Sequence, residues 1–345
     1  MDTNSTSFDL LFNQFHQVTG KALWILDENP PLNYPPATDQ IEIISNRFDI
    51  VQKMRLQGYK ANFQDFTFEN LIKHSYQFVF YRISKEKAVS HFVINSAQVL
   101  LEDTGYLVIS GAKQEGIKGY IERSSKRYSK IETFKADKQH WAAQFSAGAG
   151  NLPVLDDKDY QAIRVIHEDN NGCIYSKPGV FGWEKLDQGS QLLIAQLPSL
   201  FKDKLAPQNV LDIGCGYGLL SLHCSVLFNA SITACDNNAA AITVCKKNFE
   251  KNQVEGQVIA TDCTLGIAGY FDLIVCNPPF HSGFTVETDL IQRFLVSASA
   301  RLAADGIAVF VANLHIPLER KAKLLFKSVT TLHHNKHFKI VVLHH

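Results

Sequence analysis

Residues 210–218 read Val-Leu-Asp-Ile-Gly-Cys-Gly-Tyr-Gly, an apolar run that passes directly into three alternating glycines. A parallel strand that feeds a helix leaves backbone N–H groups free at the helix start, and residues without a Cβ let a ligand approach them. We therefore predict a strand, a turn and a helix here, with Gly214, Gly216 and Gly218 next to a nucleotide-like cofactor. The alternative is a tight strand-to-helix turn that binds nothing.

The next two strand-like segments end in acidic residues. The first, Ser-Ile-Thr-Ala-Cys, runs into Asp236, and the second, Gly-Gln-Val-Ile-Ala-Thr, runs into Asp262. An acid after the second strand can accept hydrogen bonds from both ribose hydroxyls in nucleotide-binding α/β folds. We expect Asp262 to accept from an adenine amino group, unless it only caps a helix. The predicted cofactor site also includes Asp212 in the first strand and Asn237 next to Asp236.

A fourth apolar segment, residues 271–276, stops at Asn-Pro-Pro-Phe, residues 277–280. Its continuous apolar run is typical of a buried parallel strand. The carboxyl ends of parallel strands meet at one edge of an open α/β sheet. We therefore expect Asn277 to lie beside the glycine turn and the two acids.

The Asn-Pro-Pro-Phe segment suits transfer of a group to an exocyclic amine. The lone pair of such a nitrogen is delocalised into the ring, so the nitrogen is a poor nucleophile. The side-chain oxygen of Asn277 and the carbonyl of Pro278 can each accept one N–H, while two prolines fix φ and remove competing donors. Phe280 can stack on the base. The alternative is a strand-ending turn without chemistry.

In this order and spacing, the two motifs resemble those of S-adenosylmethionine-dependent methyltransferases that modify exocyclic or amide nitrogens. Nicotinamide-binding folds use G-x-G-x-x-G instead, which would place a glycine where this chain has Leu219. The resemblance implies S-adenosylmethionine as the cofactor. It also implies catalysis mainly by alignment, with Asn277, Pro278 and Phe280 as the catalytic residues.

Length and composition restrict the other possibilities. At 345 residues the chain suggests two domains, which we place at 1–155 and 156–345. The 34 Lys and Arg balance 34 Asp and Glu, so local patches must meet any nucleic acid. Seven cysteines without C-x-x-C pairs, and histidines without suitable partners, predict free thiols and no metal site. With neither a signal segment nor a membrane-spanning run, we expect a cytoplasmic protein that contacts no membrane.

Two groups of basic residues are candidates for contact with RNA phosphates. They are Arg123, Lys126, Arg127 and Lys130 in the first half, and Arg320, Lys321, Lys323, Lys327, Lys336 and Lys339 near the carboxyl end. Contacts of this kind position a nucleic acid without reading its sequence. For each group the alternative is a solvated helix face.

The first half of the chain repeats the pattern of the second. Strand, helix, glycine turn and strand at residues 78–83 and 93–109 correspond to residues 273–278 and 295–310. Such self-similarity indicates a duplicated fold. The first copy lacks the glycines at residues 27–30, has Asn46 near the place of Asp236, and has Tyr-Arg-Ile at 81–83 in place of Asn-Pro-Pro. We expect an α/β fold of two tandem Rossmann-like class I methyltransferase domains, of which the first is degenerate and binds no cofactor.

Two segments before the glycine turn extend the resemblance to a family. They are Pro-Gly-Val-Phe at 178–181 and Leu-Asp-Gln-Gly-Ser-Gln-Leu-Leu at 186–193. With the degenerate first domain and Asn-Pro-Pro-Phe-His at 277–281, they resemble bacterial ribosomal RNA small subunit methyltransferase C. Gly-Trp at 182–183 departs from the Ser-Arg of that family, which leaves the details of this loop open.

The resemblance implies an activity and further site residues. The expected reaction is methylation of N2 of a guanine in 16S rRNA within the assembled 30S subunit, carried out by a monomer. Phe181, Asp187 and Gly189 are then expected to line the cofactor pocket. The degenerate domain is expected to bind the substrate or to stabilise its neighbour.

Three other functions stay open. Guanine-N2 methylation of 23S rRNA uses the same duplicated architecture and the same Asn-Pro-Pro-Phe-His motif. Glutamine methylation of release factors uses a related motif, but those enzymes have a tyrosine at the aromatic position and a small helical first domain. A non-catalytic RNA-binding protein is the third, and the intact motifs of the second half argue against it.

Overall fold

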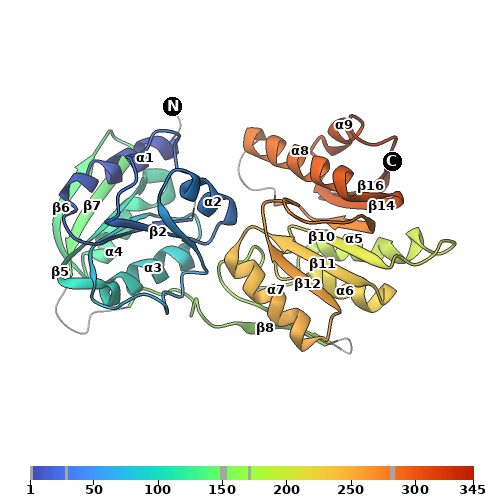
Figure 1. Cartoon of the computed structure of the whole chain (residues 1–345), viewed down its shortest axis with the longest axis horizontal. Helices are drawn as coiled ribbons and strands as arrows, with labels where there is room; N and C mark the ends of the chain where they lie inside the picture. The colour runs from blue at the N-terminus through green and yellow to red at the C-terminus, as the bar shows by residue number, and fades with distance from the viewer. Residues whose placement is uncertain (1–2, 28–29, 148–153, 170–171, 280–283) are drawn as a thin grey trace. The chain divides into compact units, whose positions relative to one another are not determined.

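The computed structural model describes residues 3–27, 30–147, 154–169, 172–279 and 284–345 (Figure 1). The chain divides into two compact units, Met1–Gln161 and Ala162–His345. The division falls after the predicted 155/156 because residues that follow 155 pack on the first unit. Asn95 Nδ2 donates to Leu155 O and to Asp157 Oδ2, at 2.8 and 3.1 Å. The Tyr160 hydroxyl donates to Asp65 at 2.7 Å.

A largely parallel sheet forms the centre of the first unit. Its strands are β1 (Ala22–Leu26), β2 (Ile41–Ser45), β3 (Lys60–Phe63), β4 (Tyr76–Arg82), β5 (Leu101–Ala112), β6 (Ser129–Lys135) and β7 (His140–Ser146). Their spatial order is β3-β2-β1-β4-β5-β7-β6, parallel from β3 to β5 and antiparallel at β7 and β6. Central parallel strands are covered on both faces, which is why every residue of β1 is buried.

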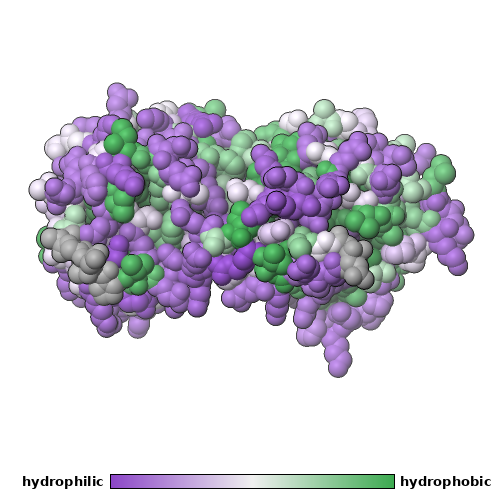
Figure 2. All heavy atoms as spheres, turned by 90° about the horizontal axis from the view of Figure 1, so that it is seen from below, coloured by the Kyte–Doolittle hydropathy of each residue, from purple (hydrophilic) through white to green (hydrophobic). Residues whose placement is uncertain are grey.

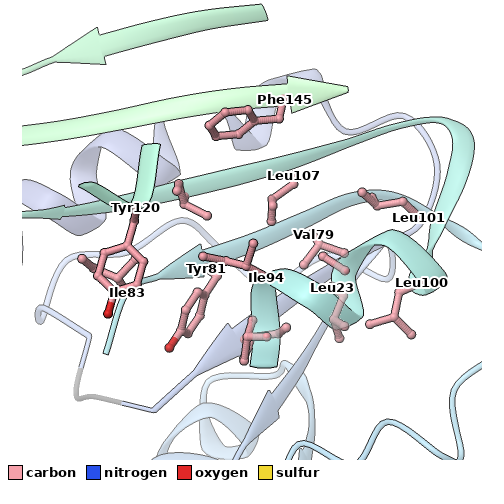
Figure 3. Close-up of a cluster of buried hydrophobic side chains, with 14 of the residues drawn as sticks. Leu23, Val79, Tyr81, Ile83, Ile94, Leu100, Leu101, Leu107, Tyr120 and Phe145 are labelled. Carbon is pink, nitrogen blue, oxygen red and sulfur yellow. The ribbon is translucent and has the colours of Figure 1, made fainter. Parts of the chain in front are cut away.

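Helices cover both faces of this sheet. They are α1 (Thr3–Phe12), α2 (Phe48–Leu56), α3 (Lys87–Leu100) and α4 (Ile117–Ser124), with 3-10 turns η1 (Phe15–Gln17) and η2 (Lys113–Glu115). Successive strand residues point to opposite faces. Leu23 and Ile25 therefore enter one core with α3 and α4, while Trp24 enters the other with α1 and α2. Figure 3 shows Leu23, Ile94 and Tyr120 in the first of these cores.

The second unit follows the same plan. Its main sheet contains β10 (Asn209–Ile213), β11 (Ser231–Asp236), β12 (Gly256–Ala260), β13 (Phe271–Cys276), β14 (Leu302–Asn313), β15 (Ser328–His334) and β16 (Phe338–His344). The spatial order, β12-β11-β10-β13-β14-β16-β15, repeats that of the first sheet, again antiparallel only at β16 and β15 among the described strands. A hairpin of β8 (Arg164–Asp169) and β9 (Gly172–Ser176) precedes this sheet in the chain.

Helices also cover both faces of the second sheet. They are α5 (Gln188–Leu200), α6 (Leu219–Phe228), α7 (Ala239–Lys251), α8 (Phe284–Arg301) and α9 (Leu318–Ala322). Val210 packs in one core with α5, α6 and α7. Leu211 packs in the other with α8 and α9. The prediction of two tandem Rossmann-like α/β domains is confirmed.

The strand registers relate the two units residue by residue. β4 pairs with β5, and β13 with β14, through ladders that shift register after Tyr76 and after Phe271 respectively. Gly105 and Gly306 stand at these shifts. A Cβ on Gly105 would lie 2.8 Å from the Tyr76 carbonyl oxygen, and one on Gly306 would lie 2.9 Å from that of Phe271. The same close approach of two backbones therefore requires a glycine in both copies.

The same registers identify what the first unit has in place of the glycine turn and its acid. β1 pairs with β2 through Ile25 and Ile44, as β10 pairs with β11 through Ile213 and Cys235. Leu26 then occupies the place of Gly214, and Ser45 occupies that of Asp236. Asn46, which the sequence suggested for the neighbourhood of Asp236, is one residue further on. Strand register decides this point, and it is not visible in the sequence.

Arg82 occupies the place of Asn277 in the first unit, because Tyr81 and Cys276 hold equivalent ladder positions. The guanidinium of Arg82 is buried and donates to Glu115 at 2.7 Å. It also lies 5.6 Å from the centre of the Phe8 ring. An internal ion pair thus fills the position where the second unit presents an amide.

The face of the molecule in Figure 2 is mainly polar. Hydrophilic residues predominate on the face in Figure 2, and hydrophobic residues lie there in separate patches. Separate apolar residues on a surface are normal and mark no binding site by themselves. Within the described parts of the chain, we find no helix that is both long and apolar enough to cross a membrane.

Candidate active site

The glycine turn joins the ends of β10 and β11. The amides of Gly214 and Cys215 both donate to the Cys235 carbonyl, at 2.8 and 3.0 Å. Gly216 has a φ of +55°, and a Cβ added to it would meet nothing within 4 Å. The backbone is therefore open at Gly216, whereas a Cβ on Gly214 would lie 3.2 Å from the Phe294 ring and one on Gly218 would lie 2.8 Å from Cys245 Sγ. This geometry fits the close approach of a cofactor that the sequence predicted.

Asp236 ends β11 and is bonded to the turn. Its Oδ2 accepts from the Gly216 amide at 3.0 Å, and its Oδ1 accepts from the Asn238 amide at 2.8 Å. Asn238 also caps α7 and donates through Nδ2 to the Gly179 carbonyl at 3.3 Å. The acid, the glycine turn and the Pro-Gly-Val-Phe loop are thus linked through Asn238. Sequence reasoning missed this residue, although an asparagine before a helix is a capping signal.

Asn277 follows β13 and is held by the start of α5. Its side-chain nitrogen Nδ2 donates to Asp187 Oδ1 at 2.6 Å and to Ser190 Oγ at 2.9 Å. A carboxylate only accepts hydrogen bonds, so the nitrogen must be the atom that faces Asp187. The two N–H groups of the amide are therefore used inside the protein. Oδ1 of Asn277 is left as the atom that can accept from a substrate.

Asp187 connects this amide to the glycine turn. It is the N-cap of α5, accepts from the Ser190 amide at 2.7 Å, and donates from its own amide to the Tyr217 hydroxyl at 3.0 Å. Gly189 is buried in the first turn of the same helix. Sequence reasoning missed Ser190 and Tyr217, because a serine in a helix and an aromatic residue between glycines carry no signal of this pairing.

The other residues predicted for the rim differ in their exposure. Pro278 is buried. Phe181 is 52% exposed, and Asn237 is half-buried beside Asp236. Phe280 lies outside the described residues.

Asp212 contributes from inside the unit. Its side chain is 1% exposed, and Oδ2 accepts from the amide and the hydroxyl of Ser221 at 3.1 and 2.7 Å. Burial raises the pKa of the Asp212 carboxyl to about 7, although the bonds from Ser221 lower it. Asp212 therefore fixes the start of α6, directly after the glycine turn, and is not part of an open rim.

Asp212→Asn is expected to remove a pH dependence of stability. The folded pKa of about 7 lies above the ordinary value of about 3.9, so between these values the folded protein keeps a proton that the unfolded chain has lost. The stability of the natural protein should therefore fall by about 2–3 kcal/mol from about pH 5 to about pH 8. Asparagine does not titrate, and the variant should lack this fall. Urea titrations of both proteins at both pH values measure the difference, and an equal change in the two would contradict the raised pKa.

Asp262 has a partner of its own. It follows β12, and its carboxylate forms a salt bridge with Arg293 of α8. Both residues line a cavity of about 580 Å³ between the loop after β12 and α8. The amide of Thr261 donates to the Asp236 carbonyl at 2.9 Å, which ties the two acid-ended strands together. Nothing in the sequence pointed to Arg293, and the adenine contact of Asp262 stays a prediction.

The structure removes several residues from the basic groups. Lys339 is buried and donates to Glu319 at 2.6 Å. Arg127 donates to the Asn95 carbonyl at 3.2 Å, and the guanidinium of Arg123 lies 4.8 Å from the Tyr120 ring centre. These contacts engage the three side chains within their own units. The exposed members of the two groups are Lys126, Lys130, Arg320, Lys323, Lys327 and Lys336. All seven cysteines are free thiols, as predicted.

The chain is similar to known methyltransferases in sequence and in fold. Residues 171–342 match the family model of the methyltransferase small domain. The chain is 30% identical over 262 residues to ribosomal RNA small subunit methyltransferase C of Shewanella pealeana, covering 74% of each chain. The same enzyme of Haemophilus influenzae strain PittGG is 27% identical over 316 residues, or 91% of each chain. A solved Thermus thermophilus 16S rRNA N2 G1207 methyltransferase, in complex with AdoMet and guanosine, is 22% identical. Its TM-score is 0.86, with 98% of this chain and 91% of that chain covered, so both units share its fold.

Proposed function

Because the chain belongs to the ribosomal RNA small subunit methyltransferase C family, we propose that it transfers a methyl group from S-adenosylmethionine to the exocyclic N2 of a guanine in 16S rRNA. The solved relative from Thermus thermophilus is a 16S rRNA N2 G1207 methyltransferase in complex with AdoMet and guanosine. The assembled 30S subunit in the cytoplasm is the proposed substrate, and a monomer is the proposed active form.

The orientation of the Asn277 amide is the observation that carries this proposal. Asp187 and Ser190 take its two N–H groups, so Oδ1 is aimed at whatever enters the site as a donor. Guanine N2 is such a donor, with two N–H groups. Oδ1 of Asn277 and the carbonyl of Pro278 can accept one each, which draws the lone pair out of the ring and aims it. The rigid Asn-Pro-Pro turn holds both acceptors in place.

S-adenosylmethionine supplies a methyl group that its sulfonium already activates. The protein therefore has to align the nitrogen and exclude competing acceptors, and no residue needs to remove a proton before transfer. Phe280 is proposed to stack on the guanine. The residues proposed to line the cofactor pocket are Phe181, Asp187, Gly189, Gly214, Gly216, Gly218, Asp236, Asn237, Asp262 and Asn277. The buried Asp212 supports them from inside the unit by fixing the start of α6.

Asp236→Ala is expected to weaken binding of S-adenosylhomocysteine by about 1–3 kcal/mol, because a charge-assisted ribose contact is lost. In the natural protein the Gly216 amide donates to Asp236 at 3.0 Å, and the loss of this bond in the variant should add to the effect. Calorimetry on the folded variants measures the affinity. Asp305→Ala removes an exposed acid of the same unit and serves as the control. Equal affinities in the two variants would remove Asp236 from the cofactor site.

The substrate is tested by offering the alternatives side by side. The protein is incubated with labelled cofactor and, separately, with 30S particles, 50S particles, naked 16S and 23S rRNA, and release factor. We expect N2-methylguanosine from the 16S rRNA of 30S particles after nuclease digestion and mass spectrometry. Label in 23S rRNA or in release factor would replace the proposal with one of its alternatives.

We propose that the first unit binds the RNA substrate and has no cofactor of its own. The positions of the glycine turn, its acid and the catalytic amide are held there by Leu26, Ser45 and Arg82. A unit that keeps its packed sheet without these groups is suited to presenting a surface.

A further inference from the structure

Lysines from separate segments surround one tryptophan of the first unit. Trp141 of β7 lines a shallow cavity of about 510 Å³, together with a set of exposed lysines around it. These are Lys113 of η2, Lys118 of α4, Lys135 of β6 and Lys138 in the turn between β6 and β7. We name these five residues the Trp141 surface. None of them was a candidate from the sequence, because they come from two short stretches, 113–118 and 135–141, that form no basic run.

Two of the lysines lie close to the indole ring. Nζ of Lys118 is 4.3 Å from the ring centre, and Nζ of Lys135 is 4.2 Å from it. Lys135 is also the residue that faces Trp141 across the β6–β7 ladder. The negative face of an aromatic ring attracts ammonium groups at these distances. The ring thus gathers two like charges that would otherwise repel each other.

The charge of this surface is not balanced from within the described structure. Asp137 is the acid that lines the cavity. Its Oδ1 accepts from the Gln139 and His140 amides at 2.6 and 2.8 Å, and its Oδ2 pairs with His140 Nδ1 at 2.9 Å. These bonds direct the carboxylate into its own turn. Among the described residues, none of the lysines of the Trp141 surface forms a salt bridge with an acid.

We propose that the Trp141 surface binds the phosphate backbone of the RNA substrate. The inference rests on the proposed function, which makes RNA the substrate. Concentrated positive charge on a chain with no net charge fits a polyanion, and phosphate contacts dominate the affinity of proteins for nucleic acids.

The test compares two double variants of the full chain. Lys118→Ala with Lys135→Ala removes the two ammonium groups at the ring. Lys21→Ala with Lys73→Ala is the matched control, because both lysines are exposed and belong to the same unit. They precede β1 and β4, at the amino ends of the parallel strands, whereas Trp141 pairs with Gly111 near the carboxyl end of β5. Binding of each fluorescently labelled protein to 30S particles is measured by anisotropy over a range of salt concentrations. Calorimetry with S-adenosylhomocysteine reports on the second unit.

We expect the variant Lys118→Ala with Lys135→Ala to bind 30S particles about tenfold more weakly. Its salt slope should be smaller by about 1.4, from two lost contacts at about 0.7 each. The control should bind like the natural protein, and both variants should bind S-adenosylhomocysteine normally. Unchanged RNA affinity and slope in the first variant would overturn the proposal. Binding to poly-glutamate is measured in the same way. If the variant lost affinity for poly-glutamate but not for 30S particles, the surface would be a docking site for an acidic protein, and the proposal would again be wrong.

The RNA-binding test of the Trp141 surface and the test of the methylation reaction can fail separately. If RNA affinity falls as expected but no N2-methylguanosine forms in 16S rRNA with the natural protein, the proposed reaction fails and the RNA surface stands. If methylation is as proposed but the first variant binds RNA and is active at the natural level, the surface assignment fails alone.

Discussion

Replacing Asn277 with alanine is expected to lower the single-turnover rate of methyl transfer by about 10²–10³-fold, because a preorganised acceptor for the reacting amine is lost. Affinity for S-adenosylhomocysteine should stay within about twofold of the natural value, since the loss falls on alignment of the nucleophile. Rapid-quench kinetics with saturating cofactor and 30S particles measure the rate, and calorimetry measures the affinity.

Ser190→Ala separates the acceptor from its support. This variant keeps Oδ1 of Asn277 and the bond to Asp187 at 2.6 Å but loses the second bond at 2.9 Å. Its rate should therefore lie between those of the natural protein and Asn277→Ala. A natural rate for Asn277→Ala would show that the amide does not act on the amine, whatever the behaviour of Ser190→Ala.

Arg82→Met in the first unit is expected to destabilise that unit by about 3–5 kcal/mol, because Glu115 is left as a buried charge without its partner. Arg82 is 1% exposed and Glu115 is 8% exposed as side chains, so water cannot replace the guanidinium. Urea unfolding followed by tryptophan fluorescence reports mainly on this unit, which contains Trp24 and Trp141, while Trp183 lies in the other.

The matched control removes both charges. Arg82→Met with Glu115→Gln keeps an acceptor for the Ala112 amide, which now donates to Glu115 at 2.8 Å. Replacement of a whole buried pair is often neutral, so the double variant should recover most of the lost stability. If Arg82→Met were as stable as the natural protein, the ion pair between Arg82 and Glu115 would not stabilise the first unit.

Much of the fold follows from local patterns. The continuous apolar runs of β1, β10 and β13 indicate buried parallel strands, and strands of this kind must alternate with covering helices. The recurrence of this pattern indicates two copies. The rule that ligands bind at the carboxyl ends of strands then places the glycine turn, Asp236 and Asn277 together. These inferences need only the order of residues along the chain.

Other features depended on which side chains meet. The bonds from Asn277 to Asp187 and Ser190 join positions separated by 90 and 87 residues. Strand register showed that Ser45, and not Asn46, is equivalent to Asp236. Lys339, which looked like one more basic residue, turned out to be buried against Glu319.

The sequence by itself determined the α/β class, the duplication, the degenerate first copy and the order of the cofactor and Asn-Pro-Pro motifs, because each is written in periodicity or in a short motif. Only the tertiary structure decided the direction of the Asn277 amide, the burial of Asp212 and the gathering of lysines around Trp141. Those depend on how side chains from different segments pack together, and a linear pattern carries no information about such contacts until packing and strand register are set.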